Sequence, residues 1–341
     1  MERMTRIFVP LAGWVRAHHH RLKWLHSLWA LLLGMGVIFF FQHDFGFIRL
    51  VIGYLFFIWA ASLLLHWESE RLGITEERRP RLRRVILYVI QNFYHEMLFF
   101  ILPLYYACTT FSSGNALFLA LIAGCALVAS FDAVYWQWLT VNTGWPRLFY
   151  SFLLFACFNI FFPVILGIRN SYSLYLAGTV AALAAVTLGR RPREWATAGA
   201  GRQFLATWAG ILLCLYLFRG FIPPCPLRLQ EMNFGTRFQP KGFRMERPLA
   251  TAGEIGSARV LYVRTAVKAP MGLYENVRLH WYRQGKPVRT SRLVTMTGGR
   301  KEGFRIWDSL TLPEGNLPAA YRVDVVSEGG QLIGRGFLPP R

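Results

Sequence analysis

Residues 148–168 read LFYSFLLFACFNIFFPVILGI, a run without any charged side chain. A helix needs about 20 such residues to cross the hydrocarbon core of a bilayer. Further apolar runs flank this one on both sides, and they cover residues 25–41, 47–66, 85–107, 116–137, 172–189 and 203–222. The pattern predicts a membrane α-helical bundle of about seven transmembrane helices.

Basic residues are distributed unevenly among the loops that would join these helices. The loops 67–84 and 190–202 are rich in arginine, whereas Arg169 is the only cation in the loops expected on the other side. Cytoplasmic loops of membrane proteins carry an excess of Lys and Arg. We therefore expect a multi-pass protein with its N-terminus in the cytoplasm and, after an odd number of spans, its C-terminal part outside.

The chain is expected to have three parts, namely a basic cytoplasmic segment (1–24), a multi-span helical domain (25–222) and a C-terminal domain (223–341). Hydrophobic residues make up 54% of the chain, which is too apolar for one soluble domain. The formal net charge is +20, and division at Pro223 leaves 19 basic and 9 acidic residues on each side. The surplus in the C-terminal domain should create a basic surface that attracts anions.

The C-terminal domain has the pattern of short β-strands. Val277, Leu279 and Trp281 alternate with polar residues, and a second alternating run is centred on Val323. Gly330 belongs to a Gly-Gly pair that favours a hairpin turn. Short strands joined by such turns predict a small all-β sandwich.

Several residues of this domain carry a resemblance to a known family. They are Leu279-His280-Trp281-Tyr282, Gly285, Arg305-Ile306-Trp307-Asp308-Ser309, Tyr321-Arg322-Val323-Asp324-Val325-Val326, Gly330, Leu332 and Phe337. They resemble an uncharacterised bacterial family of multi-span membrane proteins with a C-terminal extracytoplasmic β-domain of unknown function. Tyr321 departs from the tryptophan that is usual there. The resemblance covers about the last third of the chain, and the apolar part resembles the membrane region that often precedes this domain. It implies a bacterial inner-membrane location with a periplasmic β-domain, and it implies no activity.

A polar cluster interrupts the third apolar run. Its members within that run are Gln91, Asn92, His95 and Glu96, and the later runs place Asp132 and Asn159 at similar depth. Polar and ionisable side chains within a membrane are costly, and they face a cavity or a partner. The cluster is therefore either a site for a proton, an ion or a polar headgroup, or a hydrogen-bonded clamp between helices.

Basic side chains also gather on one predicted hairpin of the β-domain. They are Arg278, Arg283, Lys286, Arg289 and Arg292. This candidate anionic-ligand surface would suit lipid headgroups or an acidic protein partner, and the alternative is a solvated face without a ligand.

Two of the five cysteines, Cys108 and Cys225, fall on the outer side of the expected membrane. They could pair and fasten the β-domain to the helices, because disulfides persist in oxidising compartments. The alternative is two separate thiols. No metal site is predicted, since His95-Glu96 lacks the second histidine of a zinc-protease motif at Phe99. No cofactor is predicted either.

The preferred function is a non-enzymatic one, an envelope interaction or scaffolding protein that binds a protein partner or anionic lipid and no nucleic acid. The alternative is a transporter or a lipid-modifying membrane enzyme that uses the intramembrane polar cluster. A water-filled cavity around Glu96 would favour the alternative, whereas close packing there would favour the scaffold.

Overall fold

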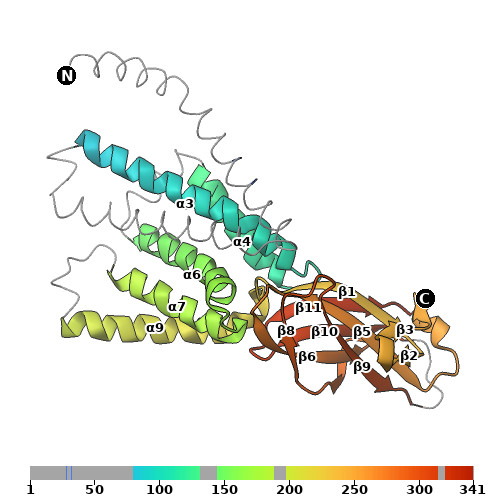
Figure 1. The fold of residues 1–341 in the computed structure, drawn as a ribbon. Coiled ribbons are helices and arrows are strands. Elements are labelled where there is room, and N and C mark those ends of the chain that lie inside the picture. Colours follow the sequence, from blue (N-terminus) through green and yellow to red (C-terminus); the bar gives the residue numbers. More distant parts are fainter. Residues whose placement is uncertain are drawn as a thin grey trace.

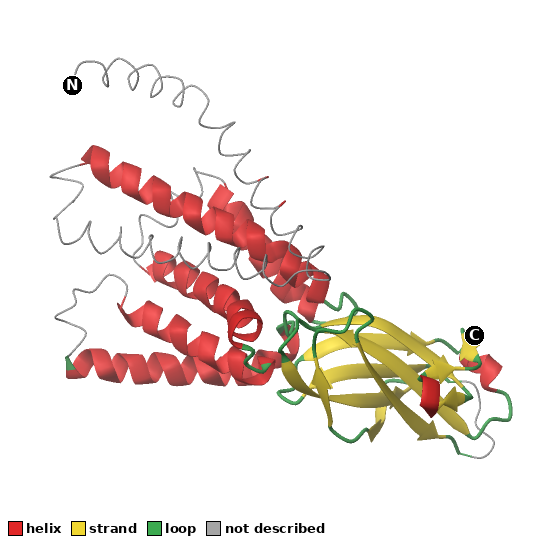
Figure 2. Ribbon diagram, in the orientation of Figure 1, coloured by secondary structure: helices red, strands yellow, loops and turns green. Residues whose placement is uncertain are grey.

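The structure, a computed structural model, describes residues 80–130, 144–187, 197–313 and 319–340, together with Leu28 and Leu32. These residues form a helical part and a β-rich part. Figure 1 shows the helices leading toward one end of the β-rich part, with the C-terminus at its opposite end. Figure 2 shows the same division by secondary structure.

The described part of the chain contains five α-helices. They are α3 (Pro80–Cys108), α4 (Asn115–Ser130), α6 (Gly144–Leu166), α7 (Asn170–Thr187) and α9 (Ala198–Phe218), and a short 3₁₀ helix, η2 (Arg219–Phe221), follows α9. Helix α3 packs against α4 and α6, while α7 contacts both α6 and α9. Gly178 of α7 allows the close approach of α9, because a Cβ atom there would lie 2.5 Å from Leu215 Cδ1.

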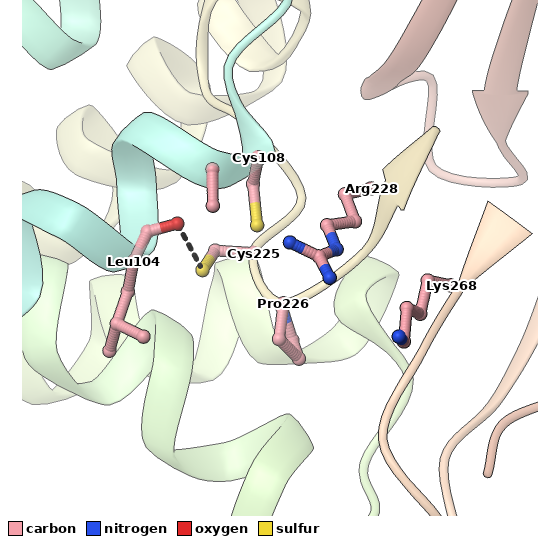
Figure 3. A pocket seen from close by; sticks show the side chains of 7 residues that line it. Leu104, Cys108, Cys225, Pro226, Arg228 and Lys268 are labelled. Carbon is pink, nitrogen blue, oxygen red and sulfur yellow. Dashed lines mark hydrogen bonds between the residues drawn. The ribbon is translucent and has the colours of Figure 1, made fainter. Parts of the chain in front are cut away.

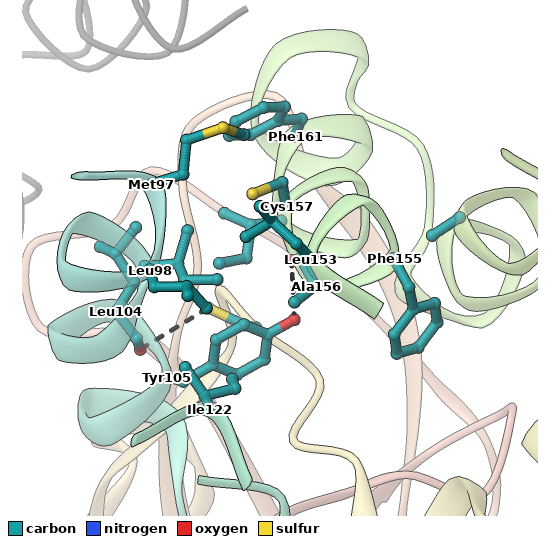
Figure 4. Close-up of a cluster of buried hydrophobic side chains, with 14 of the residues drawn as sticks. Met97, Leu98, Leu104, Tyr105, Ile122, Leu153, Phe155, Ala156, Cys157 and Phe161 are labelled. Atoms are coloured by element: carbon teal, nitrogen blue, oxygen red, sulfur yellow. Dashed lines mark hydrogen bonds between the residues drawn. The ribbon is translucent and has the colours of Figure 1, made fainter. Parts of the chain in front are cut away.

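The helices share an apolar core around Tyr105, which is fully buried (Figure 4). Its ring lies edge-on to Phe118 of α4, and its hydroxyl donates a hydrogen bond of 3.0 Å to the carbonyl oxygen of Ala156 on α6. Leu98 and Leu153 complete the core from α3 and α6. A phenol buried among apolar side chains needs such an acceptor for its hydroxyl.

The prediction of a seven-span helical bundle is wrong. Among the described residues there are five α-helices, and two segments, Arg147–Leu166 and Gly199–Phe221, are long and apolar enough to cross a membrane. The described part of helix α4 covers 16 residues, from Asn115 to Ser130. Helix α3 begins with several arginines and contains the polar cluster, and α7 begins with Asn170 and two serines. The runs expected at 25–41 and 47–66 lie outside the described residues, apart from Leu28 and Leu32.

The β-rich part is a sandwich of two antiparallel sheets, as the sequence predicts. The first has the order β4-β1-β5-β9, and the second has the order β11-β10-β6-β7, with β8 also paired to β6. The strands are β1 (Arg228–Gly235), β4 (Pro248–Leu249), β5 (Val260–Lys268), β6 (Tyr274–Arg283), β7 (Lys286–Thr290), β8 (Val294–Thr297), β9 (Phe304–Thr311), β10 (Tyr321–Ser327) and β11 (Leu332–Leu338). A small hairpin of β2 (Phe238–Gln239) and β3 (Arg244–Met245), and the 3₁₀ turns η3 (Pro240–Gly242) and η4 (Ala252–Ile255), complete it.

The alternating runs of the sequence form the core of this sandwich. Trp281 and Leu279 of β6 lie opposite Val323 and Val325 of β10, and all four are buried. The indole nitrogen of Trp281 donates a hydrogen bond of 2.9 Å to the carboxylate of Asp308 on β9. Period-two alternation of apolar residues therefore predicts these strands correctly, because it places every second side chain on the inner face.

Candidate functional site

The polar cluster of α3 lies against the last described residues of α4, Ala129 and Ser130. Gln91, His95 and Glu96 are buried, and Asn92 is half-buried. Gln91 Nε2 donates a hydrogen bond of 3.1 Å to the carbonyl oxygen of Ala129, and His95 Nε2 lies 2.7 Å from Ser130 Oγ. These contacts join two helices through buried polar groups.

Asn159 belongs to a different group from Glu96. Its Nδ2 donates a hydrogen bond of 3.1 Å to Tyr105 Oη, and its backbone oxygen accepts one of 3.1 Å from Ser173 Oγ. Tyr105 follows Glu96 by nine residues on α3, roughly 13 Å along the axis at about 1.5 Å per residue. The structure therefore does not bring Asn159 into the Glu96 group. Asp132 lies outside the described residues.

The basic residues expected on one hairpin divide between two faces of β6. Arg278 is exposed on the face opposite Trp281, because successive strand side chains alternate. Arg289 lies directly opposite Trp281 in the β6–β7 register and forms an ion pair of 3.2 Å with Asp308. Arg283 and its register partner Lys286 share the Trp281 face. Arg292 is exposed in the segment after β7.

Cys108 and Cys225 lie together, as the hypothesis of a pair requires, and both are free thiols in this structure. Cys108 is the last residue of α3, and Cys225 is in the segment that leads from η2 to β1. Cys225 Sγ donates a hydrogen bond of 3.6 Å to the carbonyl oxygen of Leu104. Burial, followed by the interaction with Cys108, raises the pKa of the Cys225 thiol. The two cysteines thus join the end of α3 to the start of the sandwich by contact.

These cysteines form part of a small open pocket (Figure 3). Its wall consists of Leu104, Ala107, Cys108, Cys225, Pro226, Arg228 and Lys268. Arg228 opens β1 and Lys268 ends β5, and the two residues are register partners. Figure 3 shows both basic side chains on the side of the pocket formed by the sandwich. The pocket therefore has apolar and thiol walls on one side and two cations on the other.

Sequence reasoning missed this basic pair. Lys268 is only 4% exposed, although lysine is almost never fully buried without a partner. Burial, and next the positive charge of Arg228, lower the pKa of the Lys268 ammonium. One feature of the sequence could have drawn attention to Lys268, because this charged residue stands between the apolar residues Val267 and Ala269.

A second polar junction fixes the sandwich to the N-terminus of α7. Glu275 of β6 is completely buried, and its carboxylate accepts a hydrogen bond of 2.7 Å from the backbone N–H of Asn170. Ser171 Oγ donates a longer one of 3.4 Å to the same carboxylate and accepts one of 2.9 Å from the backbone N–H of Gly329. A helix N-terminus favours a negative charge through its free N–H groups and its dipole.

Burial raises the pKa of Glu275, and several interactions oppose this effect. They are the hydrogen bonds from Asn276, Asn170 and Ser171 and the positive charge of Arg169. The buried carboxylate is therefore held by donors from both parts, Asn276 of the sandwich and Asn170 and Ser171 of α7.

The hairpin between β10 and β11 reaches two further helix ends. Asn115 Nδ2, at the start of α4, donates a hydrogen bond of 3.0 Å to the carbonyl oxygen of Leu332. Arg335 donates one of 2.7 Å to the carbonyl oxygen of Ser112 while its guanidinium also pairs with Asp324. Buried Gln331 donates one of 3.2 Å to the carbonyl oxygen of Ile222, after η2. The sandwich is thus attached near the C-terminal ends of α3 and α9 and at the N-terminal starts of α4 and α7.

Within the described ranges, no group of three or more His, Cys, Asp or Glu side chains is arranged to hold a metal ion. The sites that remain are the α3–α4 polar group, the pocket of Arg228 and Lys268, and the basic residues of the β6–β7 region.

A family model matches residues 4–259 of this chain, under the description "Family of unknown function (DUF5924)". The match spans the helical part and continues into the sandwich as far as the residue before β5, so the motifs that carry the resemblance of the β-domain lie beyond it. No curated protein and no solved structure matches the chain in the corresponding comparisons. Because the matched residues make up well over half of the sequence, the chain belongs to this uncharacterised family, DUF5924.

Proposed function

We propose that this chain is a membrane-embedded scaffolding or interaction protein of the bacterial cell envelope, whose helices hold the β-sandwich at the periplasmic surface of the inner membrane. The observation that carries the proposal is the junction between the two parts. A buried carboxylate, Glu275, is held by the N-terminus of α7, and polar contacts from Asn115 and Gln331 bind the same sandwich to other helix ends. A domain fixed at several points presents its surface in one orientation, as scaffolding requires.

Exposed leucines on the helices support the membrane location. They include Leu117 and Leu121 of α4, Leu148 of α6, and Leu205 and Leu213 of α9, each at least half exposed. Soluble monomers rarely expose apolar patches larger than a few hundred Å². A bilayer would cover these side chains, and the arginine-rich loops of the sequence favour an orientation with the sandwich outside.

The packing of the α3–α4 polar group favours scaffolding over transport or catalysis. Glu96 is 5% exposed and Gln91 is completely buried, so little of this group is open to water. Hydrogen bonds from Gln91 to Ala129 and between His95 and Ser130 are those of a clamp between helices. A site that moves ions or protons needs a route for water or ions to its charged group.

The ligand of the scaffold would bind to the basic surface of the sandwich. Arg278 and Arg292 are exposed, and neither forms an ion pair with a described residue. An acidic protein partner or the headgroups of anionic lipids would complement such residues.

The decisive experiment compares Glu96→Gln with Glu96→Leu in a strain that lacks the chromosomal gene. Glutamine retains the size and hydrogen-bonding capacity of glutamate but removes its charge. For a clamp, we expect Glu96→Gln to match the wild type in membrane abundance and in complementation, and Glu96→Leu to lower abundance. If Glu96→Gln accumulates normally but fails to complement, the charge itself is used, and the transporter or enzyme hypothesis replaces the scaffold.

Reporter fusions test the orientation separately. A fusion after Arg341 should be active only as a periplasmic reporter, and a fusion near Arg79 only as a cytoplasmic one. The reverse pattern for either fusion would reject the proposed orientation.

A further inference from the structure

We propose that the pocket between the end of α3 and the start of β1 is a binding site for a phosphate group, with Arg228 and Lys268 as the residues that hold it. The two side chains come from paired positions of neighbouring strands and line the same wall of the pocket. Neighbouring strands lie about 4.8 Å apart, so two register partners can contact one small anion together.

Lys268 is the observation that points to a ligand. It is 4% exposed, it lines the pocket, and within the described ranges no side chain forms an ion pair or a hydrogen bond with its ammonium group. Removing a charged group from water is costly unless a partner compensates. Arg228 adds a second positive charge, which makes the site still less favourable when it is empty. An anion between the two side chains would offset both costs.

Phosphate fits the donors better than a smaller anion would. Arginine presents several N–H groups in a plane that matches two oxygens of a phosphate, and lysine supplies a compact point charge to a third oxygen. A bound phosphate would also favour the charged form of Lys268, whose pKa burial and Arg228 lower in the free protein.

The opposite wall suggests where the phosphate comes from. Leu104, Ala107 and Pro226 are apolar, so the site can accommodate a phosphate that is attached to an apolar molecule. Cys108 ends α3 at this pocket, and if α3 lies within a bilayer, the pocket is at the depth of lipid headgroups. This step rests on the proposed function, whereas the recognition of phosphate by Arg228 and Lys268 does not.

The test measures binding to the purified full-length chain in a neutral detergent by native mass spectrometry. The probes are inorganic phosphate, phosphatidylglycerol and, as a lipid without net charge, phosphatidylcholine. The variants are Lys268→Met and Arg228→Gln, and Lys241→Met is the matched control, because Lys241 is exposed in η3 between β2 and β3, at the end of the sandwich away from the helices (Figure 1). Gel filtration and circular dichroism are used to check that each variant is folded.

We expect Lys268→Met and Arg228→Gln each to weaken binding roughly tenfold or more, which is the effect of losing one charge-assisted contact of about 1.4 kcal/mol. Lys241→Met should bind as the wild type does. Binding of phosphatidylglycerol that exceeds that of phosphatidylcholine and depends on Lys268 identifies a lipid as the source, and binding of inorganic phosphate alone identifies a free anion. Either result supports the site.

Absence of binding by both anionic probes, or binding that neither pocket variant alters, would overturn the proposal. Methionine at position 268 removes a buried charge that has no partner, so the variant should fold at least as well as the wild type. If Lys268→Met fails to fold, Arg228→Gln decides the question, since Arg228 is only half-buried. A chain that binds inorganic phosphate through Lys268 but does not fractionate with membranes would reject the proposed function and leave this site standing.

Discussion

Replacing Glu275 with leucine should loosen the β-sandwich from the helices. The substitution removes the acceptor of the 2.7 Å hydrogen bond from the backbone N–H of Asn170, a residue that is completely buried. A buried donor left without an acceptor costs about 1–3 kcal/mol. Loss of the negative charge at the N-terminus of α7 adds about 0.3–1 kcal/mol.

One effect acts in the opposite direction. Burial raises the pKa of Glu275, so the ionised carboxylate is itself costly in this position, and leucine removes that cost. We therefore expect a net loss of about 1–3 kcal/mol in the free energy that keeps the junction closed. Since about 1.4 kcal/mol corresponds to a factor of ten, local opening should become roughly 5 to 150 times more frequent.

Hydrogen exchange of backbone amides measures this opening directly. In the full-length Glu275→Leu protein, the amides of Asn170 and Gly329 should exchange faster by that factor, because Asn170 donates directly to Glu275 and Gly329 is linked to it through Ser171 Oγ. Amides within β10 should keep their protection. Glu246→Leu is the control, since Glu246 is exposed in the loop after β3. Unchanged exchange at both junction amides in Glu275→Leu would refute the argument that this carboxylate fastens the two parts.

Three further predictions concern the same domain and its junction. Trp281→Ala should lower the free energy of unfolding by about 3–5 kcal/mol, because the ring is fully buried. Chemical unfolding followed by circular dichroism measures this loss, and a loss below about 1 kcal/mol would contradict the placement of Trp281 in the core. Burial raises the pKa of Glu275 in the folded protein above its value in the unfolded chain, so the folded protein binds the proton more tightly. The resulting stabilisation is complete below the unfolded pKa and is lost as the pH rises through the folded pKa. The free energy of unfolding of the wild type minus that of Glu275→Gln should therefore be larger at acidic than at neutral pH. The same value of this difference at both pH values would argue against the raised pKa. Oxidation should join Cys108 to Cys225, which line the same pocket, and intact mass after alkylation of the unfolded chain detects the bond; alkylation of both cysteines after oxidation would rule it out.

The candidate sites could be predicted only where the sequence pattern alone identifies a residue as unusual. Gln91, His95 and Glu96 stand out because they interrupt an apolar run, and the structure places them on buried surfaces of α3. Glu275 did not stand out, because strands at protein surfaces commonly carry such residues, and the apolar neighbours Val267 and Ala269 of Lys268 did not by themselves indicate its burial. Their burial arises from contact with helices more than 100 residues away in sequence, as the hydrogen bond between Asn170 and Glu275 shows.

The sequence by itself determined the local structure of the β-sandwich and the division of the chain into an apolar helical part and a β-rich part. Alternation around Trp281 and Val323 predicts their strands, since a strand places every second side chain on one face. Apolar composition did not determine the number of spans, because it reports on burial in general and does not distinguish a lipid-facing helix from one packed against other helices.

Tertiary structure alone decided how the two parts meet and which side chains converge there. Arg228 and Lys268 become neighbours through the register of β1 and β5, which are far apart in the chain, and Arg278 and Arg289 separate because they occupy opposite faces of one sheet. Cys108 and Cys225 come together across more than 100 residues because α3 ends where the chain enters the sandwich. The physical reason is the same in each case, since periodicity along the chain fixes the face of a residue within its own element but not the element against which that face packs.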